Sequence, residues 1–229
     1  NAGANAYNIG IGYNAGGAVT TGVRNVVVGG IALDANTQSN LNVAIGHAAL
    51  TNLNHTTSTD AYNVAVGANA GEAVTTGIKN TLIGGQAGDG LTDADFNLAV
   101  GYGALSSDTL GSRSTALGYN ALLAQNFTTA TNAYNVAVGF GTGGNITTGK
   151  QNTFVGSLAA DAVTTGTNNV AVGYLALSDE TAGDNSVAIG RSALGTQNVT
   201  TGGNVYNVAV GHAAGESVTT GAFNTLVGG

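Results

Sequence analysis

One pentapeptide, Asn-aliphatic-Ala-aliphatic-Gly with variations, recurs thirteen times along this chain. Its glycines lie at positions 12, 29, 46, 67, 84, 101, 118, 139, 156, 173, 190, 211 and 228, so that successive copies are 17 or 21 residues apart. A constant period of this length is typical of a solenoid, in which each repeat forms one coil that stacks on its neighbours. We therefore predict an all-β fold, a parallel β-solenoid (β-roll) of 17-residue coils.

The 17- and 21-residue spacings themselves recur with a longer period. From Gly67 to Gly139, and again from Gly139 to Gly211, the chain advances 72 residues in three 17-residue coils and one 21-residue coil. The first unit lacks one plain coil, which a stack of coils tolerates and a globular core does not. We predict a single solenoid domain over 1–229, a segment of a longer fibre. Its units span about 12–66, 67–138, 139–210 and, in part, 211–229.

The composition argues against several classes of function. Only 7% of the 229 residues are charged, the net charge is −7, and there is no Cys. Five basic residues are too few for a nucleic-acid surface, and no apolar run reaches the ~18 residues that a membrane span needs. Without Cys there is no disulfide or thiolate metal site. The polar residues are mainly Asn, Thr, Ser and Gly, which favours an extracellular fibrous protein.

The pentapeptide predicts a short strand that is apolar on both faces. The residue before each glycine is Ile, Val or Leu, and the residue two places earlier is aliphatic or Thr. These two positions share one face of a strand, and we assign them to the core. The core residues predicted in this way are Val66, Ile83, Val100, Leu117, Val138, Val155, Val172, Ile189 and Val210.

The residue between these two points to the opposite face. It is mostly Ala, with larger side chains in the coils whose glycine is followed by Gly or Ser. A 17-residue coil can bury only a few aliphatic side chains, and the free energy gained is small compared with the entropic cost of ordering its backbone. The core of a single chain is therefore thin. We predict that this second apolar face packs against identical chains, with Leu82, Phe154 and Leu226 on the oligomer face.

The first pentapeptide position is Asn in eleven coils and Ser in two, Ser114 and Ser186. Stacked at the strand spacing of ~4.8 Å, these amides are expected to bond from coil to coil as a structural ladder. Farther along each coil, segments such as AVTTG predict a second short strand with a β-branched residue pointing inward. The predicted ladder includes Asn63, Asn80, Asn97, Asn135, Asn152, Asn169 and Asn207.

Three stretches carry a resemblance to a known family: STALGYNAL at 114–122, NVAVGYLAL at 169–177 and SVAIG at 186–190. They resemble the head repeats of trimeric autotransporter adhesins (YadA-like heads) and related repeats of phage tail fibres. The resemblance covers essentially the whole chain, although the repeats here are longer than the usual head repeat. It implies a parallel β-roll, left-handed in the adhesins, with three chains packed around an axis as a homotrimer.

The residue after the pentapeptide glycine is often aromatic. Tyr102, Tyr119 and Tyr174 lie there and are candidates for contact with receptor sugars, the alternative being plain packing over a turn. His47 and His212 occupy the same place, but no second ligand recurs at a fixed spacing, so we predict no metal site.

Three further patterns have structural and functional interpretations. Asp34, Asp89 and Asp161 recur five residues after a glycine, where they fit turns better than calcium sites, because the GGxGxD pattern is absent. Pairs of Thr suggest an ice-binding array, but the plain coils break their rows. Asn54, Asn126 and Asn198 form N-x-T triplets and are interpreted as turn residues rather than glycosylation sites.

No Ser/His/Asp set, paired acids or phosphate loop is present, so we expect neither enzymatic activity nor a cofactor. We predict a structural and adhesive segment of an extended extracellular fibre on a cell surface or virion. Its partners would be identical chains and a host-surface glycan or protein. The alternative is a self-assembling extracellular filament whose subunits join end to end through uncapped coils.

Overall fold

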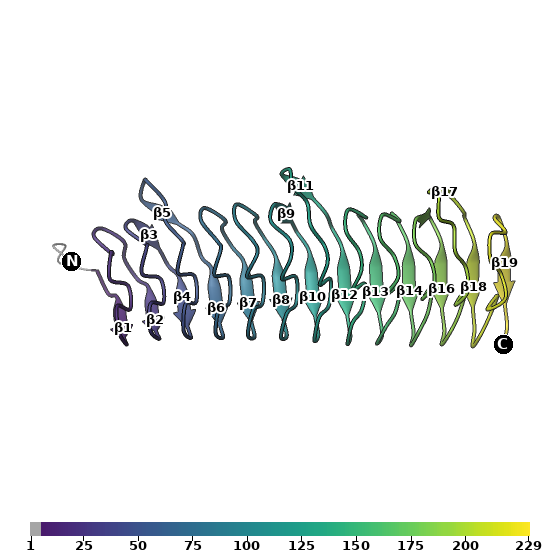
Figure 1. Cartoon of the computed structure of the whole chain (residues 1–229), viewed down its shortest axis with the longest axis horizontal. Helices are drawn as coiled ribbons and strands as arrows, with labels where there is room; N and C mark the ends of the chain where they lie inside the picture. The colour runs from purple at the N-terminus through teal and green to yellow at the C-terminus, as the bar shows by residue number, and fades with distance from the viewer. Residues whose placement is uncertain (1–5) are drawn as a thin grey trace.

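The computed structural model describes residues 6–229, which form a parallel β-solenoid with no helix (Figure 1). Thirteen short strands, one from each pentapeptide, build a single sheet along the whole of this length. The predicted all-β solenoid is confirmed. In order, the strands are β1 (Ile9–Ile11), β2 (Val26–Val28), β4 (Val43–Ile45), β6 (Val64–Val66), β7 (Thr81–Ile83), β8 (Leu98–Val100), β10 (Thr115–Leu117), β12 (Val136–Val138), β13 (Thr153–Val155), β14 (Val170–Val172), β16 (Val187–Ile189), β18 (Val208–Val210) and β19 (Thr225–Val227).

The strands pair in parallel and in the register that the repeat predicts. Val64 pairs with Thr81 and Val66 with Ile83, so like positions of the pentapeptide lie above one another. Across the 21-residue coils the register is kept, because Thr115 pairs with Val136. The four additional residues therefore leave the stack as a loop without shifting the sheet.

Three small parallel sheets lie at the roots of these loops. Each pairs a two-residue strand of the long coil with one in the coil that precedes it. The loops project on the same side of the solenoid, at the upper edge of Figure 1. The pairs are β3 (Ser39–Asn40) with β5 (Thr59–Asp60), β9 (Gly111–Ser112) with β11 (Thr131–Asn132), and β15 (Gly183–Asp184) with β17 (Gly203–Asn204).

The first pentapeptide position forms a buried ladder, as the sequence predicts, and its geometry shows two separate tasks. The side-chain oxygen of Asn80 accepts the backbone N–H of Asn97 on the next coil at 2.9 Å. The side-chain nitrogen of Asn97 donates to the carbonyl of Gly111 in its own coil, also at 2.9 Å. Each ladder amide thus bonds the backbone of the next coil through its oxygen and a carbonyl of its own coil through its nitrogen. Both polar atoms are therefore paired inside the stack.

The two faces of the strand are the reverse of the prediction. The middle pentapeptide residue points inward: Ala65, Ala99 and their equivalents between the first and last coils are buried. The residue before the glycine lies on the outer surface, where Ile83 is 38% and Val210 is 37% exposed. The assignment to the core was therefore wrong for Val66, Ile83, Val100, Leu117, Val138, Val155, Val172, Ile189 and Val210, which are half-buried or exposed.

The predicted oligomer face is wrong for the same reason. Leu82 and Phe154 are fully buried within their own chain, and Leu226 packs against the same core in the last coil. Alternation along a strand shows which residues share a face, but not which face is inside. Asn decides this, because it shares a face with the middle residue and its amide must reach across its own coil.

Side-chain volume is matched between neighbouring coils. Where the middle pentapeptide residue is large, the coil that precedes it has a glycine under the side chain. A Cβ on Gly71 would lie 2.7 Å from Leu82, and one on Gly143 would lie 3.0 Å from Phe154. Because interiors pack to near-constant density, the sequence pairs a coil that lacks a side chain with a coil that has a large one.

The AVTTG-type segments are only partly as predicted. Val74, Ile146 and Val163 point inward and are fully buried, but the segments are bends and form no strand. Instead, the carbonyl oxygen of Thr92 accepts the N–H groups of Thr75, Thr76 and Gly77 from the previous coil. The coils therefore stay bonded here without a regular ladder.

The first Thr of these segments is part of a second hydrogen-bonded row. The hydroxyl of Thr75 donates to the carbonyl of Thr92, whose own hydroxyl donates to the carbonyl of Thr109. In the long coils Asn takes this place, and its side-chain oxygen accepts the bond instead, as between Thr181 and Asn198. The plain coils continue the row, contrary to our expectation, and the hydroxyls bind the adjacent coil.

The pentapeptide glycines are required by both backbone conformation and space. All thirteen have φ between 127° and 141°, a region that is almost closed to other residues. A Cβ on Gly173 would also lie 2.6 Å from the carbonyl oxygen of Gly190 on the next coil. These glycines therefore set how closely successive coils approach.

We expect Gly173→Ala to lower the free energy of unfolding by about 3 kcal/mol or more, from backbone strain and the steric clash with the next coil. Gly30→Ala is the matched control, since its φ is outside the left-handed region and a Cβ there meets His47 at an ordinary 3.7 Å. Chemical denaturation of the two variants checks this. Equal stability would show that the glycine spacing does not depend on close contact between coils.

Candidate functional site: the outer face of the sheet

The outer face of the sheet is a continuous aliphatic strip. It consists of the second and fourth pentapeptide residues, which we call the outer columns. Strand β8 contributes Leu98 and Val100, β12 contributes Val136 and Val138, and Thr replaces the aliphatic residue of the second position in some coils. None of these residues belongs to the buried core cluster. At ~4.8 Å per strand, the strip is roughly 60 Å long.

Two lines of residues, many of them with large side chains, border this strip. The front border is the residue directly before each pentapeptide, and the rear border is the residue directly after each pentapeptide glycine. On β10, for example, the front residue is Arg113 and the rear residue is Tyr119. Both borders are largely exposed, and sequence reasoning assigned a binding role only to residues of the rear one.

The three tyrosines proposed for sugar contact all lie on the rear border. Tyr102 and Tyr119 are on adjacent coils, and their ring centroids are 5.8 Å apart in a stacked arrangement. Phe140 continues the stack, 5.2 Å from Tyr119. Tyr174 is 47% exposed but separated from this stack by Ser157. Because Tyr119 is stacked on both sides, its edge and hydroxyl are the parts left for a ligand.

The front border combines aromatic and cationic side chains. The guanidinium carbon of Arg113 lies 5.0 Å from the centre of the Phe96 ring and 5.9 Å from that of Tyr134. Lys79 lies 5.1 Å from the same Phe96 ring on its other flank. Such contacts stabilise by about 0.5–1 kcal/mol at exposed sites, and they give the border an ordered surface. The regular spacing of these residues, one before each Asn, is the sequence signal that could have revealed it.

The loop roots contain buried carboxylates that the sequence analysis missed. One oxygen of Glu180 accepts four backbone N–H groups, from Thr181, Ala182, Gly183 and Val199, at 2.7–3.1 Å. Its other oxygen accepts the side-chain N–H of Gln197 at 2.8 Å. The charge is therefore held by five donors with no cation, a strongly hydrogen-bonded arrangement for a buried anion.

Asp108 has the equivalent role 72 residues earlier in the sequence. Its carboxylate accepts the N–H groups of Gly111 and Phe127, each at 3.0 Å, and that of the Gln125 side chain at 2.5 Å. In the first unit, which lacks a plain coil, a set without a carboxylate takes over: Asn36 bonds Ser39, and the Ser39 hydroxyl bonds the ring of His55. In each unit, the residue with this role (Asn36, Asp108 or Glu180) lies in the coil directly before the long coil.

The glutamines also repair the two breaks in the asparagine ladder. Where Ser114 begins a coil, the side-chain nitrogen of Gln125 donates to its hydroxyl at 2.9 Å. The side-chain oxygen of Gln125 accepts from Asn135 on the next coil, also at 2.9 Å. Gln197 makes the same pair of bonds with Ser186 and Asn207. A Ser in the ladder with a Gln eleven residues later was the available sequence signal.

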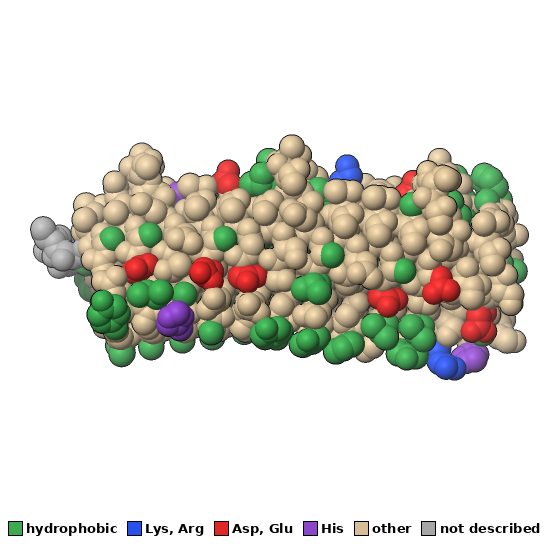
Figure 2. Space-filling view, viewed as in Figure 1, with side chains coloured by type: hydrophobic (Ala, Val, Ile, Leu, Met, Phe, Trp, Pro, Cys, Tyr) green, Lys and Arg blue, Asp and Glu red, His purple; other side chains and the backbone are tan. Residues whose placement is uncertain are grey.

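Acidic side chains form a line along the face shown in Figure 2. Several acids share one place in the coil, five residues after a pentapeptide glycine, among them Glu72, Asp89 and Asp161. Burial raises the pKa of Asp89 and of Asp161, and the nearby carboxylates of Glu72 and Asp179 respectively add to this. One oxygen of each is buried without a hydrogen-bond partner in the described chain.

The described residues offer no alternative site of metal or membrane type. Within 6–229, no three His, Cys, Asp or Glu side chains are close enough to bind a metal ion together. His212 bonds the Arg191 side chain at 3.1 Å, and Asp93 accepts the Thr76 hydroxyl at 2.5 Å. The same range contains no helix long and apolar enough to cross a membrane.

Comparison of the chain with models of known protein families, with curated proteins and with solved structures finds no match. The resemblance to adhesin and tail-fibre repeats therefore rests on the short motifs alone. Function has to be argued from the repeated surface itself.

We expect Glu180→Ala to destabilise the protein by about 3 kcal/mol or more, because it leaves several buried N–H groups without an acceptor. Asp179→Ala is the matched control, since it removes the same charge from the adjacent, exposed residue. Denaturation and hydrogen exchange of residues 198–205 check this. If both variants were equally stable, Glu180 would not hold the loop root.

Asp89→Asn should stabilise the protein at pH 7 by about 0.5–1 kcal/mol. Because the folded protein holds the Asp89 proton more tightly than the unfolded chain, this residue's contribution to stability falls as pH rises from about 4 through the raised pKa. Asp34→Asn is the control, since the Asp34 oxygens accept bonds from Asn14 and Thr51. Denaturation at pH 4 and pH 7 checks this, and a loss of stability in Asp89→Asn at pH 7 would contradict it.

Proposed function

We propose that this chain is a structural, adhesive segment of an extended extracellular fibre, built from copies that associate side by side. The observation that carries this proposal is the pair of aliphatic outer columns that run along the whole sheet. A rod of thirteen coils is roughly 60 Å long, and it performs no chemistry. Its role would be to hold a binding surface away from a cell or virion.

The size of the outer face supports association between copies. Two outer columns and their immediate flanks cover about 10 Å across and 60 Å along the rod, or roughly 600 Å². This is at the upper end of the apolar patches found on monomeric proteins. With the two borders included, the strip exceeds the ~800 Å² that each partner buries in a typical stable interface.

The form of the strip points to identical chains as the partner. Its side chains repeat at the constant spacing of parallel strands over thirteen coils. Only a surface with the same spacing can keep its side chains between those of this strip over such a length. Another copy of the solenoid meets this requirement without further adjustment. The homotrimer that the family resemblance implies is one arrangement of this kind.

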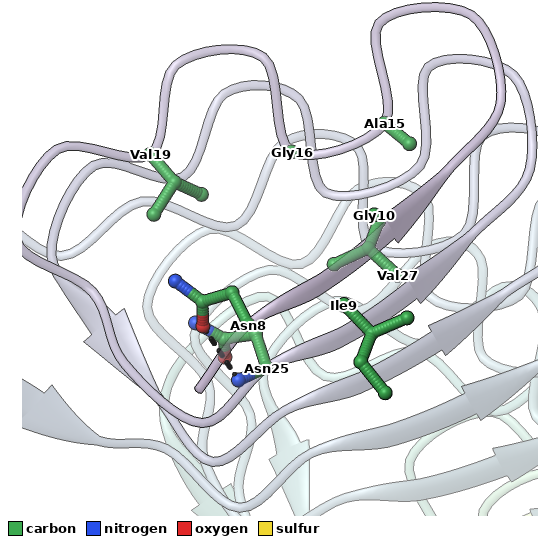
Figure 3. A pocket seen from close by; sticks show the side chains of 8 residues that line it. All are labelled: Asn8, Ile9, Gly10, Ala15, Gly16, Val19, Asn25 and Val27. Atoms are coloured by element: carbon green, nitrogen blue, oxygen red, sulfur yellow. Dashed lines mark hydrogen bonds between the residues drawn. The ribbon is translucent and has the colours of Figure 1, made fainter. Parts of the chain in front are cut away.

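A second candidate function is a filament in which copies join end to end. It is favoured by the constant parallel register, because every coil presents the same strand edge to the coil that follows it. A cavity lined by Asn8, Gly10 and Val27 lies at the first coil (Figure 3), and another lined by Gly215 and Leu226 lies at the last. Electron microscopy separates the two, since indefinite filaments would favour this alternative and rods of constant length the first.

We expect Val100→Lys together with Val138→Lys to convert the assembled protein to folded monomers, because each substitution places a charge in the apolar interface. Ser107→Lys together with Asn145→Lys is the matched control, with both changes on exposed residues away from the sheet. Sedimentation measures the mass, and circular dichroism checks that the fold is kept. A wild-type chain that sediments as a stable monomer would contradict the proposal.

A further inference from the structure

Three neighbouring strands near the middle of the solenoid have large side chains on both borders. On most other strands, at least one border residue is small or lacks an aromatic or cationic group, as with Gly85 on β7 and Ser157 on β13. We call the six border residues that flank β8, β10 and β12 the central belt. They are Phe96, Arg113 and Tyr134 on the front border, with Tyr102, Tyr119 and Phe140 on the rear border.

Each half of the belt is ordered by contacts within the chain. On the rear border, the rings of Tyr102, Tyr119 and Phe140 form one stack with interplanar angles of 15° and 7°. On the front border, Arg113 lies between the rings of Phe96 and Tyr134, and its guanidinium donates to Asn132 in the neighbouring loop root. The side chains are thus held in place although the five aromatic residues are 42–54% exposed.

The front border has a strained backbone conformation. All thirteen residues of this border have positive φ, between 48° and 63°, and none is glycine. A left-handed conformation is strained for a residue with a side chain. Phe96 and Tyr134 adopt it although their rings are 42% and 50% exposed. These side chains therefore remain on the surface of the single chain, where a second molecule can contact them.

The symmetry of a ring determines which surfaces can meet. When parallel copies surround an axis with their outer columns facing it, the start of each strand in one copy lies beside the end of a strand in the next. The front border of one copy then meets the rear border of its neighbour. Such a contact is heterologous and closes when the rotation completes a circle.

We propose that the central belt joins neighbouring copies in this way, with Phe96, Arg113 and Tyr134 of one copy against Tyr102, Tyr119 and Phe140 of the next. This inference rests on the proposed side-by-side assembly and adds its contact residues, direction and register. Aromatic and Arg side chains clustered at the centre of an interface are the usual energetic hot spots. Arg113 can also contact the exposed edge and hydroxyl of a Tyr of the neighbouring copy.

The belt also determines the axial register between copies. Both halves occupy the same three strands, so aligned copies bring all six side chains into contact. A shift of one coil would place a belt residue opposite Ser157 or Gly85, where there is no aromatic partner. The aliphatic columns repeat on every coil and cannot distinguish one register from the next. The belt therefore supplies the alignment that the columns lack.

Disulfide cross-linking tests the arrangement, because the chain has no cysteine of its own. The test pair is Gln151→Cys with Ser157→Cys, the exposed front and rear border residues of β13, which leave the belt intact. Six residues of strand separate them by roughly 20 Å, beyond the ~7 Å Cα separation that a disulfide allows. Any disulfide must then join two copies.

The matched control is Gln151→Cys with Arg191→Cys, in which the rear residue lies two coils farther along, roughly 10 Å away in aligned copies. We expect the test pair to give closed covalent rings of one size on a denaturing gel and the control pair to give none. Adding Arg113→Ala and Tyr119→Ala to the test pair should weaken association at least about tenfold, with the fold checked by circular dichroism.

The outcomes separate this inference from the proposed function. A monomeric wild-type chain would overturn both. An oligomeric wild-type chain would overturn only the belt arrangement if the control pair cross-linked in place of the test pair, if neither pair cross-linked, or if removing Arg113 and Tyr119 left association unchanged. Cross-linking of the test pair alone, lost with the belt, supports the parallel and aligned ring.

Discussion

The buried asparagine at the start of each strand is the interaction on which the rest of the structure depends. Its side-chain oxygen accepts the next coil's backbone N–H, and its side-chain nitrogen binds a carbonyl across its own coil, as Asn80 and Asn97 show. An amide held in this way must point inward. The middle residue of the pentapeptide then shares the interior, and the two aliphatic residues beside it face outward.

Much of the fold follows from the sequence, because a strict repeat leaves few ways to stack. The 17-residue period, the parallel register and the asparagine ladder all follow from like residues lying above like. The choice of inner face was wrong, because both faces of the strand are apolar and alternation alone does not separate them. The missing constraint was the asparagine amide, which must reach across its own coil, and the space that Gly71 and Gly143 leave for Leu82 and Phe154 agrees with it.

The loop roots could be predicted only with the three-dimensional path in view. Glu180 and Gln197 are 17 residues apart and show no distinctive sequence pattern, yet their side chains are hydrogen-bonded inside the stack. The 72-residue recurrence of this pair as Asp108 and Gln125 marks it as part of the repeat. The front border was missed because its residue types differ from coil to coil. These residues share a left-handed backbone conformation, and a sequence pattern reveals this conformation only where Gly or Asn is the usual residue.

Each coil that follows an asparagine of the ladder is bonded through its backbone to the side chain of that asparagine. Scalar couplings across hydrogen bonds, measured by NMR, test it directly. We predict a coupling from the backbone nitrogen of Asn97 to the side-chain carbonyl carbon of Asn80, repeated along the ladder and absent at Asn135 and Asn207, which follow Ser114 and Ser186. Couplings that join asparagines in any other order, or rapid exchange of these amide protons, would contradict the account.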